Sequence, residues 1–513
     1  MGFIHANGTT LERDGKPVLL RGFGLGGWLL PEGYMWKLPS PCDRPRRIEA
    51  LVIRLCGPEY AEAFWQNYLN RYITESDIAW IAAEGFNCVR LPINARHLRD
   101  GQAWPYVDAC VQWGKRYGVF VILDMHSAPG GQTGQNIDDC EHDQPELFQN
   151  PAFQEELIGC WQALARRYRD EEMIAGYDLL NEPLPNFFSQ YNELLLPLYR
   201  RLTTAIRQID TRHLLVAEGL HWATDFSVFD PLREEPLDDN LMLQFHKYWS
   251  EPDEESIRPF LTCAEALNLP LFAGESGENN LDWYTAAFPM YERRNVGWSF
   301  WSYKKMACDN SPVTFAQPEG WAKIQACATG GTLPREEATR IFDAFLASLQ
   351  NATHNGAVLR ALTRRAPLRL PAEHFDACEG HSLRQGTAEY RMGEPVRIVF
   401  ANGRAGKVHF DCNAGQPQPP EENLQVLLAP GETVRYRFTA DTPCAVTALC
   451  RGTGTLCLRV NSQSRRFPLT PDWQTLGLTA LPADGKLEVS LTCESGEAAL
   501  EEIAAEPARK STP

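Results

Sequence analysis

Eight short apolar segments recur between residues 17 and 350, and longer amphipathic segments separate them. The apolar segments are 18–21, 88–91, 119–123, 174–180, 214–217, 241–245, 271–273 and 297–300. Three of the intervening segments, 76–83, 153–168 and 194–209, have the pattern of helices with one buried face. Strands that alternate with helices form parallel sheets, and eight such units close into a (β/α)8 barrel. We therefore expect an α/β TIM barrel in this part of the chain.

A different pattern follows the segment 351–370. Short, largely alternating runs at 396–400, 433–438, 456–460 and 487–491 are separated by Gly, Pro, Asn and Asp, which is typical of an all-β sandwich. Because 513 residues exceed one ordinary core, we expect two domains. These are a catalytic barrel over 1–360 and a jelly-roll-like sandwich over 361–513. Few aromatic residues suit a sugar platform there, which favours a structural sandwich over a carbohydrate-binding module.

Charge and composition exclude several classes of partner. A net charge of −17 disfavours nucleic acid and anionic membranes, because both require a basic surface, and it suits a neutral substrate. The sequence shows no basic leader before an apolar run and no segment long enough to span a bilayer. We expect a cytoplasmic protein with reduced, buried cysteines; a trimmed leader would instead allow secretion. The sequence leaves the oligomeric state open.

Two glutamates directly follow apolar runs that we expect to be strands. Glu182 follows the run that ends at Asn181, and Glu275 follows the run that ends at Gly274. A buried carboxylate is costly unless it is paired or used, so either glutamate alone could be a salt-bridged strand end. The carboxyl ends of parallel strands meet on one face of a barrel, so we expect the two to face each other. Such a pair can cleave a glycosidic bond. Asn181 would then bind the sugar 2-hydroxyl.

Other polar residues also fall at expected strand ends. Arg90 lies at the end of the second run, where we expect it inside the barrel; such an arginine needs a carboxylate partner, which we expect to be Glu275, kept ionised by the guanidinium. His126 follows the third apolar run. His246 and Tyr248 follow the sixth, where they could orient the nucleophile and bind the sugar.

Aromatic and acidic residues complete the expected site. Trp301 follows the eighth run and could stack on a sugar ring, and Trp28 is a looser candidate for the same role. The acidic loop 138–143 lacks the spacing of a cation site, so we expect Asp139 to bind substrate hydroxyls rather than a metal. Long insertions at 32–72 and 306–333 follow the first and eighth strands, where connections shape binding sites.

These motifs together resemble glycoside hydrolase family 5, in the clan of retaining (β/α)8 glycosidases. The motifs are the strands of Arg90 and His126, the string 181–183, His246-x-Tyr248, Glu275 and Trp301. The resemblance implies that Glu182 is the acid/base and Glu275 the nucleophile, and it implies no metal and no organic cofactor. Segments 22–29, 73–78 and 124–134 look like those of exo-β-1,3-glucanase and β-glucosidase members.

We therefore expect a retaining glycosidase that acts from the chain end on β-glucosides or β-glucan oligosaccharides. One alternative shares this mechanism: an enzyme that releases a disaccharide, or one that hydrolyses glycosylceramides, sterol glucosides or flavonoid glycosides. An alternative of another class is a carbohydrate-binding protein without activity. The paired glutamates argue against this alternative. In each case the partner is a carbohydrate or glycoside.

Overall fold

The computed structural model describes residues 2–412 and 415–508, which fall into two compact units. The first comprises residues 1–247, 259–277 and 295–354, and the second comprises 248–258, 278–294 and 355–513. We describe each by itself. The predicted domain ranges 1–360 and 361–513 stay a prediction.

The first unit contains the predicted barrel, which is confirmed. Eight parallel strands close in chain order, with β9 and β10 paired to complete the ring. They are β4 (Arg21–Gly24), β5 (Cys88–Asn94), β6 (Phe120–Ser127), β7 (Ile174–Asp178), β8 (Leu214–Glu218), β9 (Leu241–Lys247), β10 (Leu271–Gly277) and β11 (Gly297–Trp301). Seven of the strands are buried along their whole length, as expected of parallel strands covered on both faces. Functional side chains can therefore reach solvent only from the strand ends.

The first barrel strand lies later than the sequence predicts. Residues 18–21 were expected, but Val18 ends β3 (Lys16–Val18) of a small sheet with β1 (His5–Asn7) and β2 (Thr10–Arg13). The turn between β2 and β3 is Asp14-Gly15, both with positive φ, which is the preferred chemistry of a two-residue hairpin. Leu11 of this sheet and Ile4, just before β1, share an apolar cluster with Cys88 and Leu214, which begin β5 and β8. The small sheet thus packs on the amino-terminal end of the barrel, opposite the candidate site.

Helices follow the barrel strands, and several begin with clear capping residues. Thr74 and Asp77 form a reciprocal capping box at α3, and Asn150 caps α7 just before Pro151. The helices and short helical turns through α10 are η1 (Gly33–Trp36), α1 (Pro45–Cys56), α2 (Pro58–Tyr72), α3 (Glu75–Ala83), α4 (Ala95–Arg99), α5 (Trp104–Tyr117), α6 (Glu146–Gln149), α7 (Pro151–Tyr168), η2 (Asn186–Leu194), α8 (Leu195–Arg207), α9 (Leu220–Ala223), η3 (Phe226–Arg233) and α10 (Glu254–Leu267).

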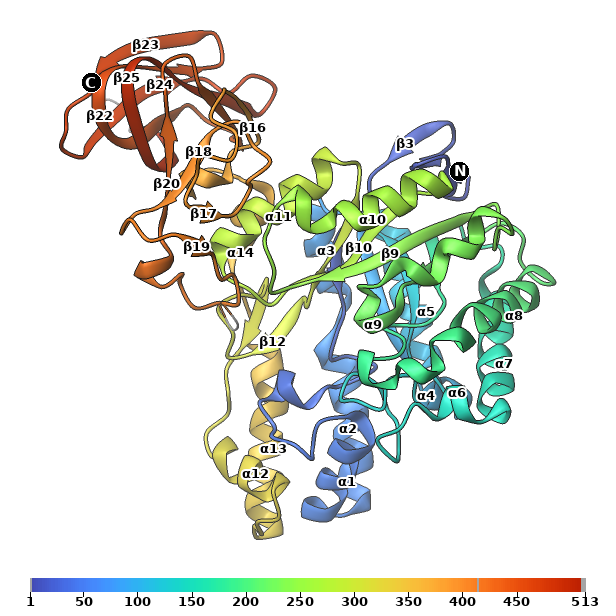
Figure 1. Ribbon diagram of the computed structural model, residues 1–513. Helices are drawn as coiled ribbons and strands as arrows, with labels where there is room; N and C mark the ends of the chain where they lie inside the picture. The colour runs from blue at the N-terminus through green and yellow to red at the C-terminus, as the bar shows by residue number, and fades with distance from the viewer. Residues whose placement is uncertain (1, 413–414, 509–513) are drawn as a thin grey trace. The chain divides into compact units, whose positions relative to one another are not determined.

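The two insertions of the barrel pack together. The first contains α1 and α2; the second contains β12 (Lys304–Met306), β13 (Val313–Phe315) and α12 (Trp321–Ala328), and is followed by α13 (Arg335–Gln350) and β14 (Thr353–His354). Figure 1 shows α1, α2, α12 and α13 side by side. Aromatic rings join them: Phe345 of α13 lies 4.6 Å from the ring of Trp36 and 5.2 Å from that of Trp321.

In its described residues, the second unit is all-β apart from the first turn of α10, the helices α11 (Leu281–Arg293) and α14 (Gly356–Thr363), and two short turns, η4 (Ala372–His374) and η6 (Pro420–Glu422). Its strands are β15 (Leu368–Pro371), β16 (Ala377–Glu379), β17 (Ala388–Glu389), β18 (Arg397–Phe400), β19 (Gly406–Lys407), β20 (Leu424–Leu428), β21 (Thr433–Thr439), β22 (Cys444–Val460), β23 (Gln463–Pro468), β24 (Gln474–Ala480) and β25 (Lys486–Pro507). Nine of them form one antiparallel sheet around a shared apolar core. This confirms the predicted all-β unit.

Two further predictions concern the whole chain. All fifteen cysteines lie in the described part, and none forms a disulfide, as expected. Among the described residues, no helix combines the length and the apolar character that a membrane crossing requires.

Candidate active site

Glu182 lies in a strained turn just beyond β7. Its φ is +42° and that of Leu184 is +54°, a left-handed conformation that costs a residue other than glycine about 1–3 kcal/mol. The backbone N–H of Glu182 donates to Glu218 Oε2 at 2.7 Å. This bond satisfies a buried donor and fixes the turn, so the carboxylate of Glu182 has one defined direction.

Glu275 lies within β10, at an irregularity in the strand. The register shifts between Ala273 and Glu275 against β9, and between Ala273 and Ser276 against β11. A Cβ atom on Gly274 would lie 2.0 Å from Cδ of Gln244, so glycine is needed for that side chain to approach. Such a bulge changes the direction of the next side chain. Here that side chain is the carboxylate of Glu275.

The two glutamates face each other across His246. One carboxylate oxygen of Glu182, one of Glu275 and a ring nitrogen of His246 all lie within 4.8 Å of one another. His246 Nδ1 is 2.6 Å from Glu182 Oε1 and 3.6 Å from Glu275 Oε2. Both glutamates are buried: Glu182 is 7 % exposed and Glu275 is 4 % exposed. The pair predicted from the strand ends is therefore brought together in the structure.

Arg90 of β5 joins most of the buried carboxylates of this site. Its Nη1 donates to Glu275 Oε1 at 2.7 Å and lies 3.1 Å from Asp124 Oδ2. Its Nε donates to Asp178 Oδ2 at 2.8 Å, and its Nη2 donates to Glu218 Oε1 at 2.9 Å. Nη2 also donates to the Asn181 side chain at 2.8 Å. Since Arg90 is fully buried, it fixes the positions of groups from five strands or strand ends at once.

The charges in this cluster are set by burial and by two cations. Burial raises the pKa of Asp178 well above its usual value and that of Asp124 to about 8, so both favour the neutral form. Burial acts on Glu218 in the same sense, but His246 and Arg90 outweigh it and hold its pKa at about 2. Glu218 is therefore the permanent anion at the base of the site.

The pKa values of His246 and Glu275 are likewise set by burial on one side and by neighbouring charges on the other. Burial disfavours the charged imidazole of His246, but Glu218, Glu275 and Glu182 outweigh it and raise its pKa well above the usual value. Burial raises the pKa of Glu275, and the opposing effects of His246 and Arg90 only reduce that shift. Arg90 is thus the partner expected for Glu275, but it does not lower that pKa overall. The ligand atoms of Glu182, His246 and Glu275 have metal-ligand spacing.

His126 and Trp301 form one wall beside Glu275. The two rings stack with centroids 5.2 Å apart and planes at 8°. His126 Nδ1 is 2.7 Å from Asp124 Oδ2, and burial lowers the pKa of His126 to about 4, which keeps the ring neutral. Trp301 Nε1 donates to the hydroxyl of Tyr34, a residue of the first insertion, at 2.9 Å. The first insertion therefore contributes to the rim, as expected.

Two predicted site residues, Asp139 and Trp28, have their partners outside this cluster. Asp139 accepts hydrogen bonds from Arg46, Arg96 and Asn94, so its oxygens already have protein partners. Trp28 is 1 % exposed; its Nε1 donates to the Leu69 carbonyl and its ring stacks on Trp113. Tyr248 belongs to the second unit. The substrate-binding roles of these three residues stay predictions.

Sequence reasoning missed four members of the cluster: Asp124, Asp178, Glu218 and Gln244. Glu218 carried the same signal as the two predicted glutamates, because it directly follows the apolar run 214–217. Asp124 and Gln244 each lie two residues before a predicted histidine, on the same face of a strand. Gln244 Nε2 donates to Asp178 Oδ2 at 2.9 Å and also contacts Glu218.

A parallel barrel with two buried, facing carboxylates at its strand ends defines a class of proteins that act on glycosides. Comparison with known proteins gives the family. Residues 56–307 match the model of Cellulase (glycosyl hydrolase family 5).

Individual relatives agree with this family. A beta-xylosidase of Phanerodontia chrysosporium is 34% identical over 238 residues, covering 45% of this chain and 48% of the relative. A probable glucan 1,3-beta-glucosidase A of Aspergillus niger is 30% identical over 190 residues, covering 35% and 45%. The chain thus spans about half the length of these relatives. A solved endogalactoceramidase matches 98% of this chain and 100% of its own, with a TM-score of 0.50 at 16% identity, which shows the fold alone.

Proposed function

We propose that this protein is a retaining glycoside hydrolase that cleaves β-glycosidic bonds by double displacement. The observation that carries the proposal is the spacing of Glu182 and Glu275, whose facing oxygens lie within 4.8 Å. Retaining enzymes hold their two carboxyl groups about 5–5.5 Å apart, whereas inverting enzymes need roughly 6.5–9.5 Å to admit a water molecule. The spacing supports direct attack by one carboxylate on the sugar.

In the proposed reaction, Glu275 is the nucleophile and Glu182 the acid/base. Arg90 Nη1 donates to Glu275 Oε1 at 2.7 Å, which orients this carboxylate for attack on the anomeric carbon. Glu182 Oε1 lies 2.6 Å from His246 Nδ1, and in this proposal Glu182 donates the proton that the departing oxygen requires. Once the leaving group departs, Glu182 removes a proton from water, which then releases the sugar from Glu275. The stacked ring of Trp301 supports a sugar at this position.

The proposed substrates are β-glucosides or β-glucan oligosaccharides cleaved from one end. The names of the relatives, a beta-xylosidase and a probable glucan 1,3-beta-glucosidase, support a β-linked sugar. The contact between Trp301 and Tyr34 supports a closed rim built partly by the first insertion. Hydrolysis of a panel of aryl β-glucosides, β-xylosides and β-linked disaccharide glycosides tests the sugar. Release of intact disaccharides would point instead to the disaccharide-releasing alternative.

Azide rescue assigns the two glutamates. Glu275→Gly and Glu182→Ala are assayed with an activated aryl β-glucoside, and Glu265→Gln, an exposed residue, serves as the control. We expect Glu275→Gly to be inactive until azide attacks directly, giving the α-glucosyl azide. We expect Glu182→Ala to lose about 10²–10⁴-fold with a poor leaving group and to form the β-glucosyl azide. Interchanged products would reverse the roles, and two fully active variants would indicate a binding protein.

A further inference from the structure

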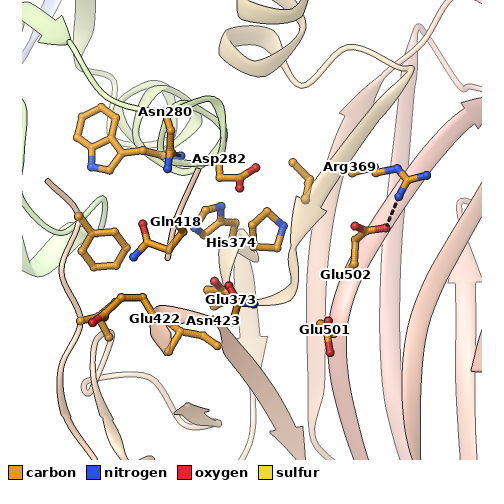
Figure 2. Close-up of a pocket in the computed structure, with 16 residues that line it drawn as sticks. Asn280, Asp282, Arg369, Glu373, His374, Gln418, Glu422, Asn423, Glu501 and Glu502 are labelled. Atoms are coloured by element: carbon orange, nitrogen blue, oxygen red, sulfur yellow. Dashed lines mark hydrogen bonds and ion pairs between the residues drawn. The ribbon is translucent and has the colours of Figure 1, made fainter. Parts of the chain in front are cut away.

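The second unit contains a cavity that the proposed reaction does not use. It has a volume of about 190 Å³ and lies between the first turn of α11, β15, the η4 turn, β25 and the residues 408–410 and 418–424. All of its lining residues belong to the second unit. In Figure 2, Glu373 lies near the centre of the view, with Asp282 above it and Glu501 and Glu502 to its right. We call this space the acidic cavity.

Glu373 is the residue that makes this cavity unusual. It is 8 % exposed, and within the described residues its Oε2 atom has no hydrogen-bond partner. A buried carboxylate without a partner costs several kcal/mol unless it is protonated or meets a cation. Burial, with a smaller contribution from Asp282, raises the pKa of Glu373 to about 7. At neutral pH this carboxylate is therefore partly protonated, and its ionised form can pair with a positive charge.

The rest of the cavity offers acceptors rather than donors. Across the described part of the chain, the carboxylates of Asp282 and Glu501 have no hydrogen bond or ion pair, and both line the cavity. Two of the amide donors are already engaged: Asn280 Nδ2 donates to the Gln416 carbonyl, and Gln418 Nε2 donates to the His409 carbonyl. An acceptor-rich cavity suits a ligand that only donates hydrogen bonds, as an ammonium group does.

The positive groups near the cavity do not neutralise these carboxylates. Arg391 donates to the Glu373 carbonyl at 2.7 Å and pairs with Glu394, and it only reduces the rise in the pKa of Glu373. Arg369 is 69% exposed at its side chain and lies 3.4 Å from Glu502. His374 Nδ1 contacts the Thr285 hydroxyl at 3.0 Å, and burial lowers the pKa of His374 well below its usual value, so its ring is neutral. A bare metal ion is also disfavoured. Within the described residues, only Glu182, His246 and Glu275 form a group with metal-ligand spacing.

We propose that the acidic cavity binds a small organic ammonium ion through the carboxylates of Glu373 and Asp282. Its volume exceeds that of a single ion, and the carboxylates border a space rather than converge on one point. The aromatic residues Trp283 and Phe410 provide an apolar wall for a short carbon chain. The ligand is thus a primary amine with an aliphatic body, bound by charge and by donated hydrogen bonds.

Calorimetric titration of the full chain tests this proposal, with 1,4-diaminobutane as the probe and 1,4-butanediol as its neutral analogue. At pH 8 we expect binding of the diamine only. Glu373→Gln should weaken that binding at least tenfold, and Asp282→Asn should also weaken it. The exposed Asp472→Asn, matched to Asp282→Asn, should leave it unchanged. Glycosidase activity of each variant reports that the chain is folded.

The pH dependence provides a second readout. Since the diamine stays fully charged, its affinity should follow the ionised fraction of Glu373, whose pKa is about 7. We expect binding about tenfold tighter at pH 8 than at pH 6, and no such change in Glu373→Gln. Four results would overturn the proposal: no binding of the diamine, equal binding of the diol, unchanged binding in Glu373→Gln, or binding of Ca²⁺ in place of the amine.

Discussion

At the scale of single residues, Glu218 links both halves of the proposed catalytic apparatus. Its Oε1 atom accepts from Arg90 and lies 3.4 Å from His246 Nε2, while its Oε2 accepts the backbone N–H of Glu182. It therefore supports the acid/base turn directly and the nucleophile through Arg90. We regard Glu218 as a positioning residue, since these contacts go to protein groups.

Glu218→Gln should change the pH profile as well as the rate. The variant keeps the shape of the side chain but removes the anion that most strongly raises the pKa of His246. That pKa should fall, so His246 loses its proton at a lower pH. We expect the alkaline limb of kcat/KM to move to lower pH and kcat to drop on the order of 10²-fold. Steady-state kinetics from pH 4 to 10 measure both.

The exposed Glu265→Gln variant serves as the matched control for this experiment. It should reproduce the wild-type pH profile. A Glu218→Gln enzyme with a lower rate but an unshifted alkaline limb would show that Glu218 is only structural.

The sequence predicts that some of these residues belong to the site but does not reveal others, for a physical reason. Glu182 and Glu275 could be predicted because a carboxylate after an apolar run is costly and therefore informative. Glu218 shares that pattern, but its carboxylate bonds to protein groups. A sequence does not distinguish a carboxylate that bonds to the protein from one that binds substrate. The placement of Asp139 depends on Arg46 and Arg96, distant in sequence, so no local pattern reveals its partners.

At the scale of elements, the packing of the two insertions depends on Phe345 of α13. This side chain is fully buried, and its ring contacts those of Trp36, Tyr68 and Trp321. Its removal should leave a cavity where the first insertion, α12 and α13 meet. Because η1 of that insertion also contains Tyr34, the same packing supports the rim residue that contacts Trp301.

Phe345→Ala should lower the free energy of unfolding by about 3–5 kcal/mol, the usual cost of removing a buried phenyl group. Phe187→Ala, at a ring that is 57% exposed, should cost far less. Thermal and urea unfolding of the two variants measure the difference. Equal stabilities would contradict the importance of this aromatic cluster.

Element boundaries were harder to predict than element types. The sequence indicated short strands at 456–460 and 487–491, whereas β22 and β25 run for 17 and 22 residues. Glycines usually interrupt strands, but here Gly452, Gly454 and Gly496 adopt positive φ near shifts of register, so the ladder continues through them. Long-range pairing, absent from the sequence pattern, decides the length of these strands.

At the scale of the whole molecule, the chain combines a family 5 barrel with an all-β unit that contains its own acidic cavity. The net charge of −17 fits both sites, since one is proposed to bind a neutral glycoside and the other a cation. The two sites are testable separately, because substitutions in the acidic cavity should leave hydrolysis unchanged.

The most direct test of the account is the configuration of the first sugar released. Hydrolysis of an aryl β-glycoside cleaved by the enzyme is followed by ¹H NMR before the anomers equilibrate. With Glu182 and Glu275 within 4.8 Å, double displacement should release the β-anomer first. First appearance of the α-anomer would show inversion and would contradict a covalent intermediate on Glu275.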